Sequence, residues 1–348
     1  MTSPDPRREA LARWVVRDLG LPLERLEIAS ADASFRRYFR AFLAGGATRI
    51  VMDAPPQHED TAPYLKIARL MRELGVHVPA IDAVQGEQGF ILLEDLGNTM
   101  YLGALRETAR ATALYGAALE TLAELQLRGQ AVLESLAPYD APVWQRELHL
   151  MPEWFCARHL GLTLSAEEQS LIAETFDFLI AECLAQPRVF VHRDYHSRNL
   201  MVLARGGPGV IDFQDALAGP VAYDLVSLLK DCYIAWPRAA VEFWVRQYRD
   251  LLCARGGRSL VGASTQEFLR GFDLVGVQRH IKVLGIFARL CWRDGKRGYL
   301  DDLPLTLDYL RDTCARHPSL QAFGAWLEQR IVPRLPAANA RARAAAPV

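Results

Sequence analysis

The chain has 348 residues, of which 51% are hydrophobic and 23% are charged, so it can bury a sizeable core. Its formal net charge of −1 argues against non-specific nucleic-acid binding as the main activity. No apolar run is long enough to span a membrane, no signal-peptide core opens the sequence, and the six cysteines include no C-x-x-C pair. We therefore expect a cytoplasmic monomer without a disulfide or zinc framework, and no nucleic-acid or membrane partner.

The first hundred residues predict a small antiparallel sheet with helices beside it. The predicted elements are a helix between Pro6 and Gly20, strands over 38–43 and 48–52, a helix over 63–74, and strands over 81–84 and 90–93. Each pair of strands is joined by a short glycine-containing turn, which is typical of a hairpin. The second hairpin ends in Glu94-Asp95-Leu96-Gly97.

Beyond residue 98 the hydrophobic pattern becomes mainly helical, to about residue 332. The segment 144–155 mixes polar and aromatic residues. It either lines a sugar site through residues such as Glu153 and Trp154, or forms an amphipathic helix with tryptophan in the core. Arg293, near the end of a later helix, either reaches a substrate cleft or lies in solvent. Residues 336–348 are rich in Ala and Arg and predict a flexible, frayed tail.

Residues 189–213 contain the motif that indicates chemistry. An apolar strand leads into His192-Arg-Asp-Tyr-His-Ser-Arg-Asn199, and a two-strand ribbon then leads to Asp212-Phe213. This order matches the protein-kinase catalytic loop H-R-D-x-x-x-x-N followed by an Asp-Phe metal motif. Phosphoryl transfer needs a carboxylate beside the attacking hydroxyl and hard oxygen ligands for magnesium. The motif therefore predicts Asp194 as the catalytic carboxylate, Asn199 and Asp212 as Mg²⁺ ligands, and ATP as the phosphoryl donor.

In a kinase-like site of this kind, the segment after residue 29 is expected to bind the phosphates of the nucleotide. Ser30, Asp32 and Ser34 stand where the covering loop of a kinase carries glycines, and Phe35 and Arg36 follow them. Backbone amides and hydroxyls would then contact the phosphates. The alternative is an ordinary turn rich in Ser and Asp.

The third predicted strand lacks the lysine that pairs with nucleotide phosphates in kinases, because Met52 stands where it is expected. Another cation must neutralise the phosphates. The candidates are Arg36, Arg37, Arg40, Arg49 and Lys66, with Glu73 or Glu59 as a possible partner.

Glu94, Asp95 and Leu96 follow the last strand of the predicted sheet, where a kinase has the hinge between its lobes. There the backbone would hydrogen-bond an adenine edge. The alternative is an acidic turn without a ligand.

Three further positions refine the interpretation. Tyr195-His196 and Gln214 depart from the protein-kinase pattern and are typical of small-molecule kinases related to aminoglycoside and choline kinases. The possible substrate-binding residues are His196, Glu153, Trp154, Gln214, Asp215 and Arg293. Asp224, near a helix start, is predicted to bind backbone amides and position the catalytic loop, which is a structural role.

Five blocks together make a more specific resemblance. They are Ser30–Phe39, Val51–Pro56, Phe90–Gly97, His192–Asn199 and Ile211–Asp215. Over about residues 5 to 330 the chain resembles the bacterial N-acetylmuramate/N-acetylglucosamine anomeric kinases of the aminoglycoside phosphotransferase-like superfamily. The resemblance implies an α+β, bilobal protein-kinase-like fold: an N-terminal lobe over 1–96, a helical C-terminal lobe over 97–335, and the tail 336–348.

The same resemblance implies ATP- and Mg²⁺-dependent phosphorylation of the C1 hydroxyl of an amino sugar. That activity serves peptidoglycan recycling by a route that avoids the fosfomycin-sensitive step. It also implies that Met52-Asp53 in place of the strand lysine is a family feature and not a sign of an inactive enzyme.

Two other hypotheses remain at this stage. One is a kinase for another small molecule, such as an aminoglycoside, choline or homoserine. Residues 230–348 carry 19 Lys and Arg against 11 Asp and Glu, which favours a neutral or anionic acceptor over these cationic ones. The other is a nucleotide-binding regulator without turnover, which the intact set of Asp194, Asn199 and Asp212 disfavours.

Overall fold

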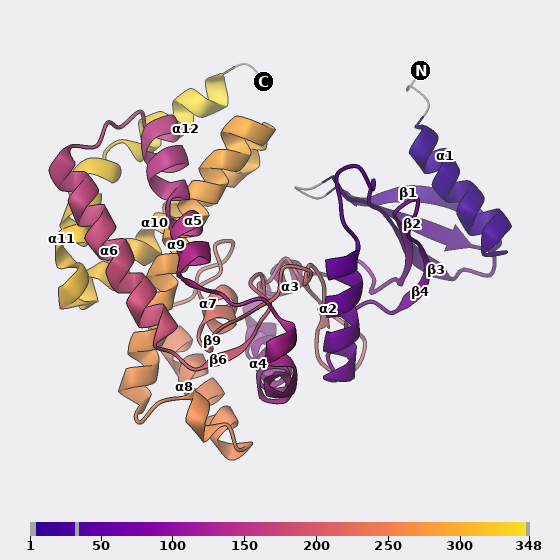
Figure 1. The fold of residues 1–348 in the computed structure, drawn as a ribbon, viewed down its shortest axis with the longest axis horizontal. Helices are drawn as coiled ribbons and strands as arrows, with labels where there is room; N and C mark the ends of the chain where they lie inside the picture. Colours follow the sequence, from indigo (N-terminus) through magenta and orange to yellow (C-terminus); the bar gives the residue numbers. More distant parts are fainter. Residues whose placement is uncertain (1–4, 32–34, 346–348) are drawn as a thin grey trace. The chain divides into compact units, whose positions relative to one another are not determined.

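The computed structural model describes residues 5–31 and 35–345, although the side chains of Ser30 and Ala31 are not described (Figure 1). The chain divides into two compact units. The N-terminal unit comprises residues 1–99 and 201–215, and the C-terminal unit comprises residues 100–200 and 216–348. The hairpin at 201–215 thus groups with the N-terminal sheet, whereas the sequence-based division assigned it to the C-terminal lobe.

The N-terminal unit is built on a five-stranded antiparallel sheet with the strand order β1-β2-β3-β5-β4. Its strands are β1 (Leu23–Ala31), β2 (Arg37–Leu43), β3 (Thr48–Asp53), β4 (Ile81–Gln85) and β5 (Phe90–Glu94). Gly45 and Gly46 have positive φ in the β2–β3 turn, a conformation that glycine adopts at little cost. Gly89 also has positive φ, and a side chain there would collide with the Ala54 carbonyl oxygen. These turns fix the predicted hairpins.

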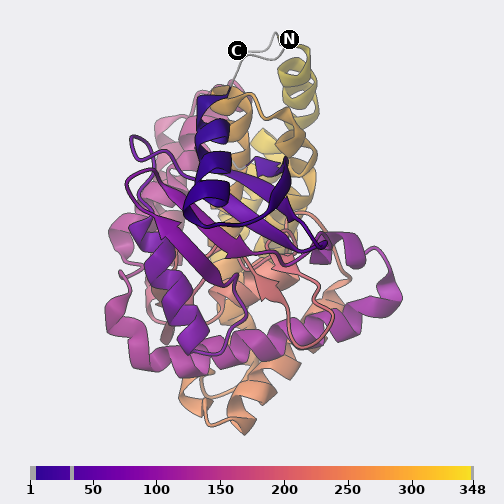
Figure 2. The ribbon, with the colours of Figure 1, turned by 90° about the vertical axis from the view of Figure 1, so that its right-hand side faces the viewer.

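One face of this sheet is covered by the N-terminal helix, as Figure 2 shows for the indigo helix α1. Helix α1 (Pro6–Arg13) begins at Asp5, whose carboxylate accepts a hydrogen bond from the Arg8 N–H, and continues as η1 (Trp14–Asp18). The apolar residues of this helical segment pack on alternate residues of β2, β3 and β5, forming a buried cluster. The other helix of the unit is α2 (Ala62–Glu73), with Tyr64, Ile67, Ala68 and Met71 buried.

The C-terminal unit is mainly helical and contains one short strand pairing, while a second pairing belongs to the 201–215 hairpin. Its longer helices are α4 (Thr108–Arg128), α5 (Ala141–Leu148), α6 (Ala166–Leu184), α8 (Arg238–Ala254), α9 (Thr265–Asp294), α10 (Leu303–Arg316) and α12 (Leu335–Ala344). The shorter helical segments are α3 (Tyr101–Ala104), η2 (Gly129–Ser135), η3 (Met151–His159), α7 (Tyr223–Leu229), η4 (Arg258–Leu260), η5 (Arg297–Asp301), η6 (Pro318–Leu320), α11 (Gln321–Trp326) and η7 (Leu327–Ile331). Strand β6 (Arg188–Val191) pairs with β9 (Leu217–Pro220), and β7 (Leu200–Met201) pairs with β8 (Gly209–Val210) at the hairpin.

Helix α9 forms the centre of the C-terminal unit and packs against α6, α7, α10 and η3 (Figure 1). It begins at Ser264, whose hydroxyl accepts a hydrogen bond from the Glu267 N–H, and ends at Gly295 in the left-handed region. Most of its residues from Phe268 to Cys291 are buried. Gly285 allows close approach, because a Cβ there would lie 2.4 Å from the Leu150 carbonyl carbon.

The C-terminal residues differ from the flexible tail that the sequence predicted. Residues 335–344 form α12, and Leu335, Ala338 and Ala342 on this helix are buried. The Asn339 side chain accepts a hydrogen bond from His159 at 2.8 Å, with the ring nitrogen as donor. The Ala-rich composition that indicated fraying instead supports a helix, because alanine has the highest helix propensity.

All six cysteines are free. Within the described ranges, no helix combines the length and apolar character that a bilayer span requires.

A buried ionic network joins α9 to α10, to the end of α7 and to the start of α8. Asp273 on α9 accepts hydrogen bonds from the Lys230 Nζ at 2.9 Å and from the Arg238 guanidinium at 2.7 and 3.0 Å. Lys230 also donates to the Thr313 hydroxyl at 3.2 Å. Burial acts to raise the pKa of Asp273, but Lys230 and Arg238 outweigh it and keep that pKa well below its usual range.

We predict that Asp273→Asn lowers the free energy of unfolding by about 3–5 kcal/mol, because it leaves Lys230 buried without its counter-charge. The loss should be nearly constant between pH 5 and 8. Because the pKa of Asp273 is depressed in the fold, its carboxylate contributes fully to the free energy of unfolding above the unfolded pKa of 3.8. This stabilisation is lost only as the pH falls further. Denaturant unfolding at several pH values measures this loss in the free energy of unfolding. Asp250→Asn, at an exposed position, is the control and should change little.

Candidate active site

The segment with the kinase-like motif forms a loop directly after β6, and Asp224 fixes its backbone. The Asp224 carboxylate accepts hydrogen bonds from the N–H groups of His192 at 2.7 Å and Arg193 at 3.0 Å. Asp224 is fully buried in the first turn of α7. The predicted binding of backbone amides by this residue is confirmed, and its role in positioning the loop stays a prediction.

Arg193 has a backbone conformation that needs this support. Its φ is +78°, in the left-handed region that costs a residue other than glycine about 1–3 kcal/mol. Besides the Asp224 contact, its carbonyl oxygen accepts a hydrogen bond from the Arg279 guanidinium at 2.9 Å, and its own guanidinium donates to Glu147. The surrounding elements therefore enforce a conformation that the chain would not adopt alone, and this conformation determines where Asp194 points.

Asp194 lies in a strongly positive environment. The Arg279 guanidinium is 3.8 Å from its carboxylate, and its side chain is 39% exposed. Burial acts to raise the pKa of Asp194, but the charges of Lys282, Arg279 and Arg193 outweigh it and hold that pKa well below its usual range. The carboxyl group is therefore ionised at neutral pH and can accept a hydrogen bond from a hydroxyl group.

Glu147 on α5 binds two of these cations and was not among the predicted site residues. Its carboxylate contacts the Arg193 guanidinium, accepts a hydrogen bond from the Tyr139 hydroxyl, and lies 3.0 Å from the Lys282 Nζ. Lys282 also donates to the Tyr223 hydroxyl at 3.1 Å. Glu147 thus fixes Arg193 and Lys282 beside Asp194.

Arg279 and Lys282 were also missed by the sequence interpretation, although the sequence contained a signal for them. They lie on the same helix as the apolar stripe of Val277, Ile281, Leu284 and Phe287, but on its opposite face. Charged residues within a largely buried helix are rare unless they are paired. Here both are buried, and their partners come from elements distant in sequence.

The remainder of the loop positions Asn199 and His196 near Asp194. The Asn199 Nδ2 donates to the Asp194 carbonyl oxygen at 3.0 Å, which leaves its side-chain oxygen as the end of the amide that suits a hard cation. The Ser197 N–H donates to Asp231 at 3.0 Å. Burial lowers the pKa of His196, and its Nδ1 is buried without a hydrogen-bond partner among the described residues. Its ring is therefore neutral at pH 7.

Asp212 belongs to the N-terminal unit, whereas Asp194 and Asn199 belong to the C-terminal unit. It has a φ of +64°, and its Oδ1 accepts a hydrogen bond from the Gln214 side chain at 2.9 Å. Gln214 also contacts Asp215 at 3.3 Å. Phe213 is buried and packs on Tyr64 of α2 with ring centroids 4.8 Å apart. Shared metal binding by Asp212 and Asn199, and acceptor binding by Gln214 and Asp215, stay predictions.

The predicted phosphate-binding segment is described in part. Ser30 lies in β1, while Asp32 and Ser34 fall outside the described residues. The Phe35 N–H donates to the Glu59 carboxylate at 3.0 Å, and the Phe35 ring stacks on His58. The Arg36 guanidinium lies 3.8 Å from the same carboxylate. Glu59, one of the two acids considered, is therefore the residue that pairs with a candidate cation.

The other arginine candidates for neutralising the phosphates are already bound to carboxylates. Arg37 contacts the buried Asp53 at 2.5 and 3.0 Å, and also Asp5. Arg49 contacts Asp82 at 2.6 Å. Arg40 binds Asp95 through two hydrogen bonds of 2.7 and 3.0 Å.

The segment predicted as the hinge is tied to the sheet. The Glu94 N–H donates to the Ala80 carbonyl oxygen at 2.8 Å, so it is not available to an adenine edge. The Asp95 carboxylate accepts hydrogen bonds from the Gly97 N–H and Arg40. Leu96 lies against the 201–215 hairpin, because a Cβ on Gly209 would be 2.8 Å from a Leu96 methyl group. The predicted hydrogen bonds to an adenine edge would therefore come from the backbone of Asp95 and Leu96, and they stay a prediction.

The remaining substrate candidates lie together, but away from Asp194. Glu153, Trp154 and Arg293 line a cavity of about 260 Å³ with Arg158 and Trp292. Arg293 follows Lys282 by eleven residues on α9, a rise of roughly 16 Å at 1.5 Å per residue. The cavity therefore lies well along α9 from Asp194. Trp144, in contrast, is buried and stacks on Tyr139, so the core alternative holds for that residue.

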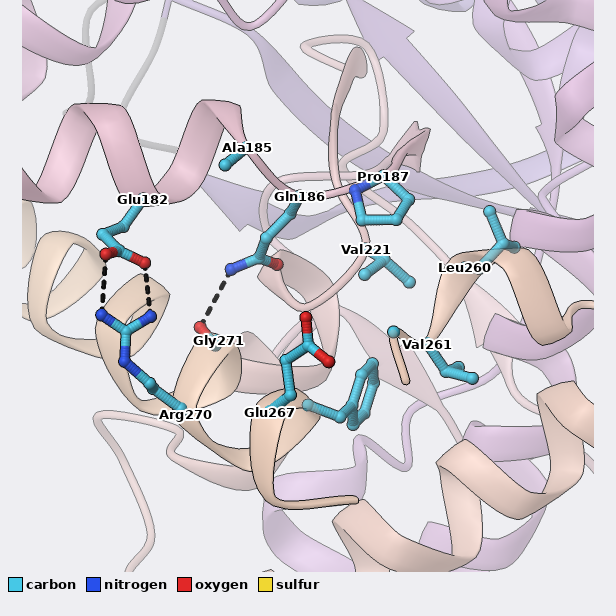
Figure 3. Close-up of a pocket in the computed structure, with 12 residues that line it drawn as sticks. Glu182, Ala185, Gln186, Pro187, Val221, Leu260, Val261, Glu267, Arg270 and Gly271 are labelled. Atoms are coloured by element: carbon cyan, nitrogen blue, oxygen red, sulfur yellow. Dashed lines mark hydrogen bonds and ion pairs between the residues drawn. The ribbon is translucent and has the colours of Figure 1, made fainter. Parts of the chain in front are cut away.

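A smaller cavity of about 140 Å³ lies between the end of α6 and the start of α9 (Figure 3). Its polar side chains bind one another. Arg270 forms two hydrogen bonds with Glu182 at 2.5 and 2.7 Å, and the Gln186 side chain donates to the Gly271 carbonyl at 3.1 Å. None of the loop residues lines this cavity, and it is not the candidate active site.

Comparison with known proteins identifies the family and the fold of the chain. Residues 25–261 match the phosphotransferase enzyme family. Solved structures with a similar fold include a choline kinase from Streptococcus pneumoniae (TM-score 0.61, 12% identity, 88% of this chain and 99% of that chain) and an ethanolamine kinase from Plasmodium vivax (TM-score 0.62, 13% identity, 91% and 89%). The predicted α+β, kinase-like fold class is confirmed, and the chain belongs to the phosphotransferase enzyme family, whose members transfer a phosphoryl group to an alcohol acceptor.

Curated relatives are more similar in sequence. An N-acetylmuramate/N-acetylglucosamine kinase from Pseudomonas aeruginosa is 47% identical over 88% of this chain and 89% of its own length. Enzymes of the same name from Neisseria meningitidis and Pseudomonas putida are 45% and 42% identical, over 88% and 93% of this chain and 90% and 96% of their own lengths. The chain is thus similar to these amino-sugar kinases over nearly their full length.

We predict that Asp224→Asn lowers both turnover and stability, because one amide oxygen cannot accept both loop N–H groups. The expected loss of stability is about 1–3 kcal/mol. Burial raises the pKa of Asp224 to about 7, so the fold favours its protonated form. The stability that the wild type gains from protonated Asp224 is complete below pH 3.8 and is lost as the pH rises through 7. The difference in the free energy of unfolding between wild type and variant should therefore narrow from pH 5 to 8. Denaturant unfolding across this range measures the difference, and a difference that widens would contradict the assignment.

Proposed function

We propose that this protein is an ATP-dependent kinase that phosphorylates the C1 hydroxyl of N-acetylmuramate and/or N-acetylglucosamine. The observation that carries the proposal is the ionised Asp194, fixed on a loop beside Arg279 and Lys282. The names of the relatives that are 42–47% identical over most of the chain supply the acceptor class. The product, a sugar 1-phosphate, is a form that nucleotidyl transfer can convert to a nucleotide sugar, which fits a role in cell-wall recycling.

In this mechanism Asp194 orients the acceptor more than it activates it. A carboxylate with a depressed pKa is a weak base, so it accepts a hydrogen bond from the C1 hydroxyl and takes the proton late in the transfer. An anomeric hydroxyl is more acidic than an ordinary alcohol, which reduces the need for a strong base. Transfer then depends on the alignment of the hydroxyl oxygen with the terminal phosphate.

The cations beside Asp194 supply the charge complementarity. Arg193, Arg279 and Lys282 outnumber the carboxylates of Glu147 and Asp194 in this cluster. A positive surplus attracts a phosphoryl group and disfavours a cationic acceptor near Asp194. This balance supports a neutral or anionic sugar over choline or an aminoglycoside.

Asn199 and Asp212 would hold Mg²⁺ when both substrates are bound. An amide oxygen and a carboxylate are hard donors, and both fit magnesium better than a soft metal. The ion would neutralise charge on the transferred phosphates. The side chain of Gln214, through its hydrogen bond to Asp212, would fix the orientation of that carboxylate. His196, neutral and next to Asp194 in the loop, is placed to contact the acceptor.

Arg36 is the best candidate to replace the strand lysine. It directly follows the segment assigned to the phosphates, and its guanidinium lies 3.8 Å from the Glu59 carboxylate. The pair corresponds to the Lys–Glu pair of a protein kinase, in which the acid positions the cation for the phosphates.

The direct test is to incubate the purified protein with ATP, Mg²⁺ and single acceptors, and to measure ADP and sugar 1-phosphate. The panel contains N-acetylmuramate, N-acetylglucosamine, choline, homoserine and an aminoglycoside. We expect turnover with one or both amino sugars. Turnover with choline or an aminoglycoside alone would reject the assignment.

We predict that Asp194→Asn lowers kcat by about 10²–10⁴-fold, because the amide cannot take the acceptor proton. The Kd for ATP should change less than about threefold, since Asp194 contacts the acceptor and not the nucleotide. Initial rates and nucleotide titration measure the two quantities. A variant with near wild-type kcat would remove Asp194 from the mechanism.

We predict that Arg36→Met raises the KM for ATP by roughly 10- to 100-fold, the loss expected for one hydrogen-bonded charge contact to a phosphate. The KM for the sugar should stay nearly unchanged. Arg49→Met is the matched control, because Arg49 is bound to Asp82. Equal effects of the two substitutions on the KM for ATP would show that neither arginine has a specific role.

A further inference from the structure

Helix α9 presents a row of cations that begins beside the catalytic carboxylate. Arg279, Lys282, Arg289 and Arg293 occupy positions that fall within an arc of about 80° on the helix at 3.6 residues per turn. The row runs from Asp194, which faces Arg279, to the cavity lined by Trp154, Trp292 and Arg293.

Within this row, Arg289 differs in its contacts. Arg279 and Lys282 bind the loop, Glu147 and Tyr223, and Arg293 binds Asp294. Arg289 has no hydrogen bond or ion pair with any residue in the described ranges, and its Nε is buried. Burial and the charge of Arg293 lower the pKa of Arg289, and Asp294 and Glu153 offset this only in part. A partly buried guanidinium without a direct counter-charge is costly in a folded protein, so it commonly marks a ligand site.

The distance of Arg289 from Asp194 along α9 indicates how long a ligand must be to contact both residues. Arg289 follows Arg279, which faces Asp194, by ten residues on the same face, a rise of roughly 15 Å. This distance, less the reach of the arginine side chain, suits a pyranose ring that carries an acidic substituent. Glu153 on η3 faces the same region, because its charge acts on Arg289. The aromatic side chains of Trp154 and Trp292 border the adjoining cavity.

We propose that Arg289 binds the carboxylate of an anionic acceptor whose C1 hydroxyl lies at Asp194, and so selects N-acetylmuramate over N-acetylglucosamine. This inference rests on the proposed function, which supplies the two acceptors. N-acetylmuramate carries an ether-linked carboxylate that N-acetylglucosamine lacks. The selection therefore comes from one charge-assisted contact that only the acidic sugar can make.

The test compares the two sugars on Arg289→Met, which keeps an apolar side chain of similar length and removes the charge. We expect kcat/KM for N-acetylmuramate to fall by about 10- to 100-fold, mostly through KM, and kcat/KM for N-acetylglucosamine to stay within about twofold. Arg289→Lys should recover part of the loss. Arg270→Met on the same helix, where Glu182 binds the guanidinium, is the control and should leave both values unchanged.

Stability separates recognition from a structural role. Because Arg289 has no described partner and the fold disfavours its charge, Arg289→Met should leave the Tm unchanged or raise it. A lower Tm with equal losses for both sugars would overturn the inference, as would unchanged kinetics for N-acetylmuramate.

A binding experiment keeps the inference separate from the proposed function. Calorimetric titration compares N-acetylmuramate with its methyl ester, which lacks the negative charge. We expect the wild type to bind the acid at least tenfold more tightly, and Arg289→Met to bind both with similar affinity. Equal affinities in the wild type would overturn the inference. If the wild type phosphorylates neither sugar, the proposed function fails, and the titration still decides whether Arg289 recognises a carboxylate.

Discussion

The candidate active site depends on one buried carboxylate that binds two adjacent backbone amides. Asp224 accepts hydrogen bonds from His192 and Arg193, and this contact holds Arg193 in the left-handed region. Without it, the backbone would relax toward a more favourable φ, and the side chain of Asp194 would turn with it. The position of Asp194 is therefore set by a residue thirty positions later in the chain, at the start of α7.

Ion pairs and hydrogen bonds of buried charged residues explain why several elements meet at this loop. Glu147 from α5 and Tyr223 from α7 bind Lys282, while Arg279 binds the Arg193 carbonyl. Buried charges of both signs compensate one another, and the surplus is positive where a phosphoryl group would arrive. Helix α9, which carries Arg279 and Lys282, also carries Arg289, whose charge lacks a described partner. Helix α9 thus links the surroundings of Asp194 to the region where we propose that the acceptor is recognised.

The sequence motifs identified the residue types of the site better than its surroundings. Asp194, Asn199 and Asp212 follow from a fixed spacing, and Asp224 follows from its place near a helix start. Glu147, Arg279 and Lys282 have no such spacing, because their distance from the loop in sequence is set by the lengths of intervening helices. The tail was misjudged for a related reason. Its Ala-rich composition is compatible with fraying or with a helix, and contacts with η3 and η5 favour the helix.

The amino-acid sequence alone determined the fold class, the two N-terminal hairpins with the helix between them, and the phosphotransferase chemistry, because hydrophobic periodicity and motif spacing are local properties. Only the tertiary structure decided which charges surround Asp194, that Glu59 and not Glu73 pairs with Arg36, and that Glu153, Trp154 and Arg293 lie along α9 from the catalytic loop. Electrostatic environment and burial depend on which distant segments pack together. No pattern within a single segment encodes them.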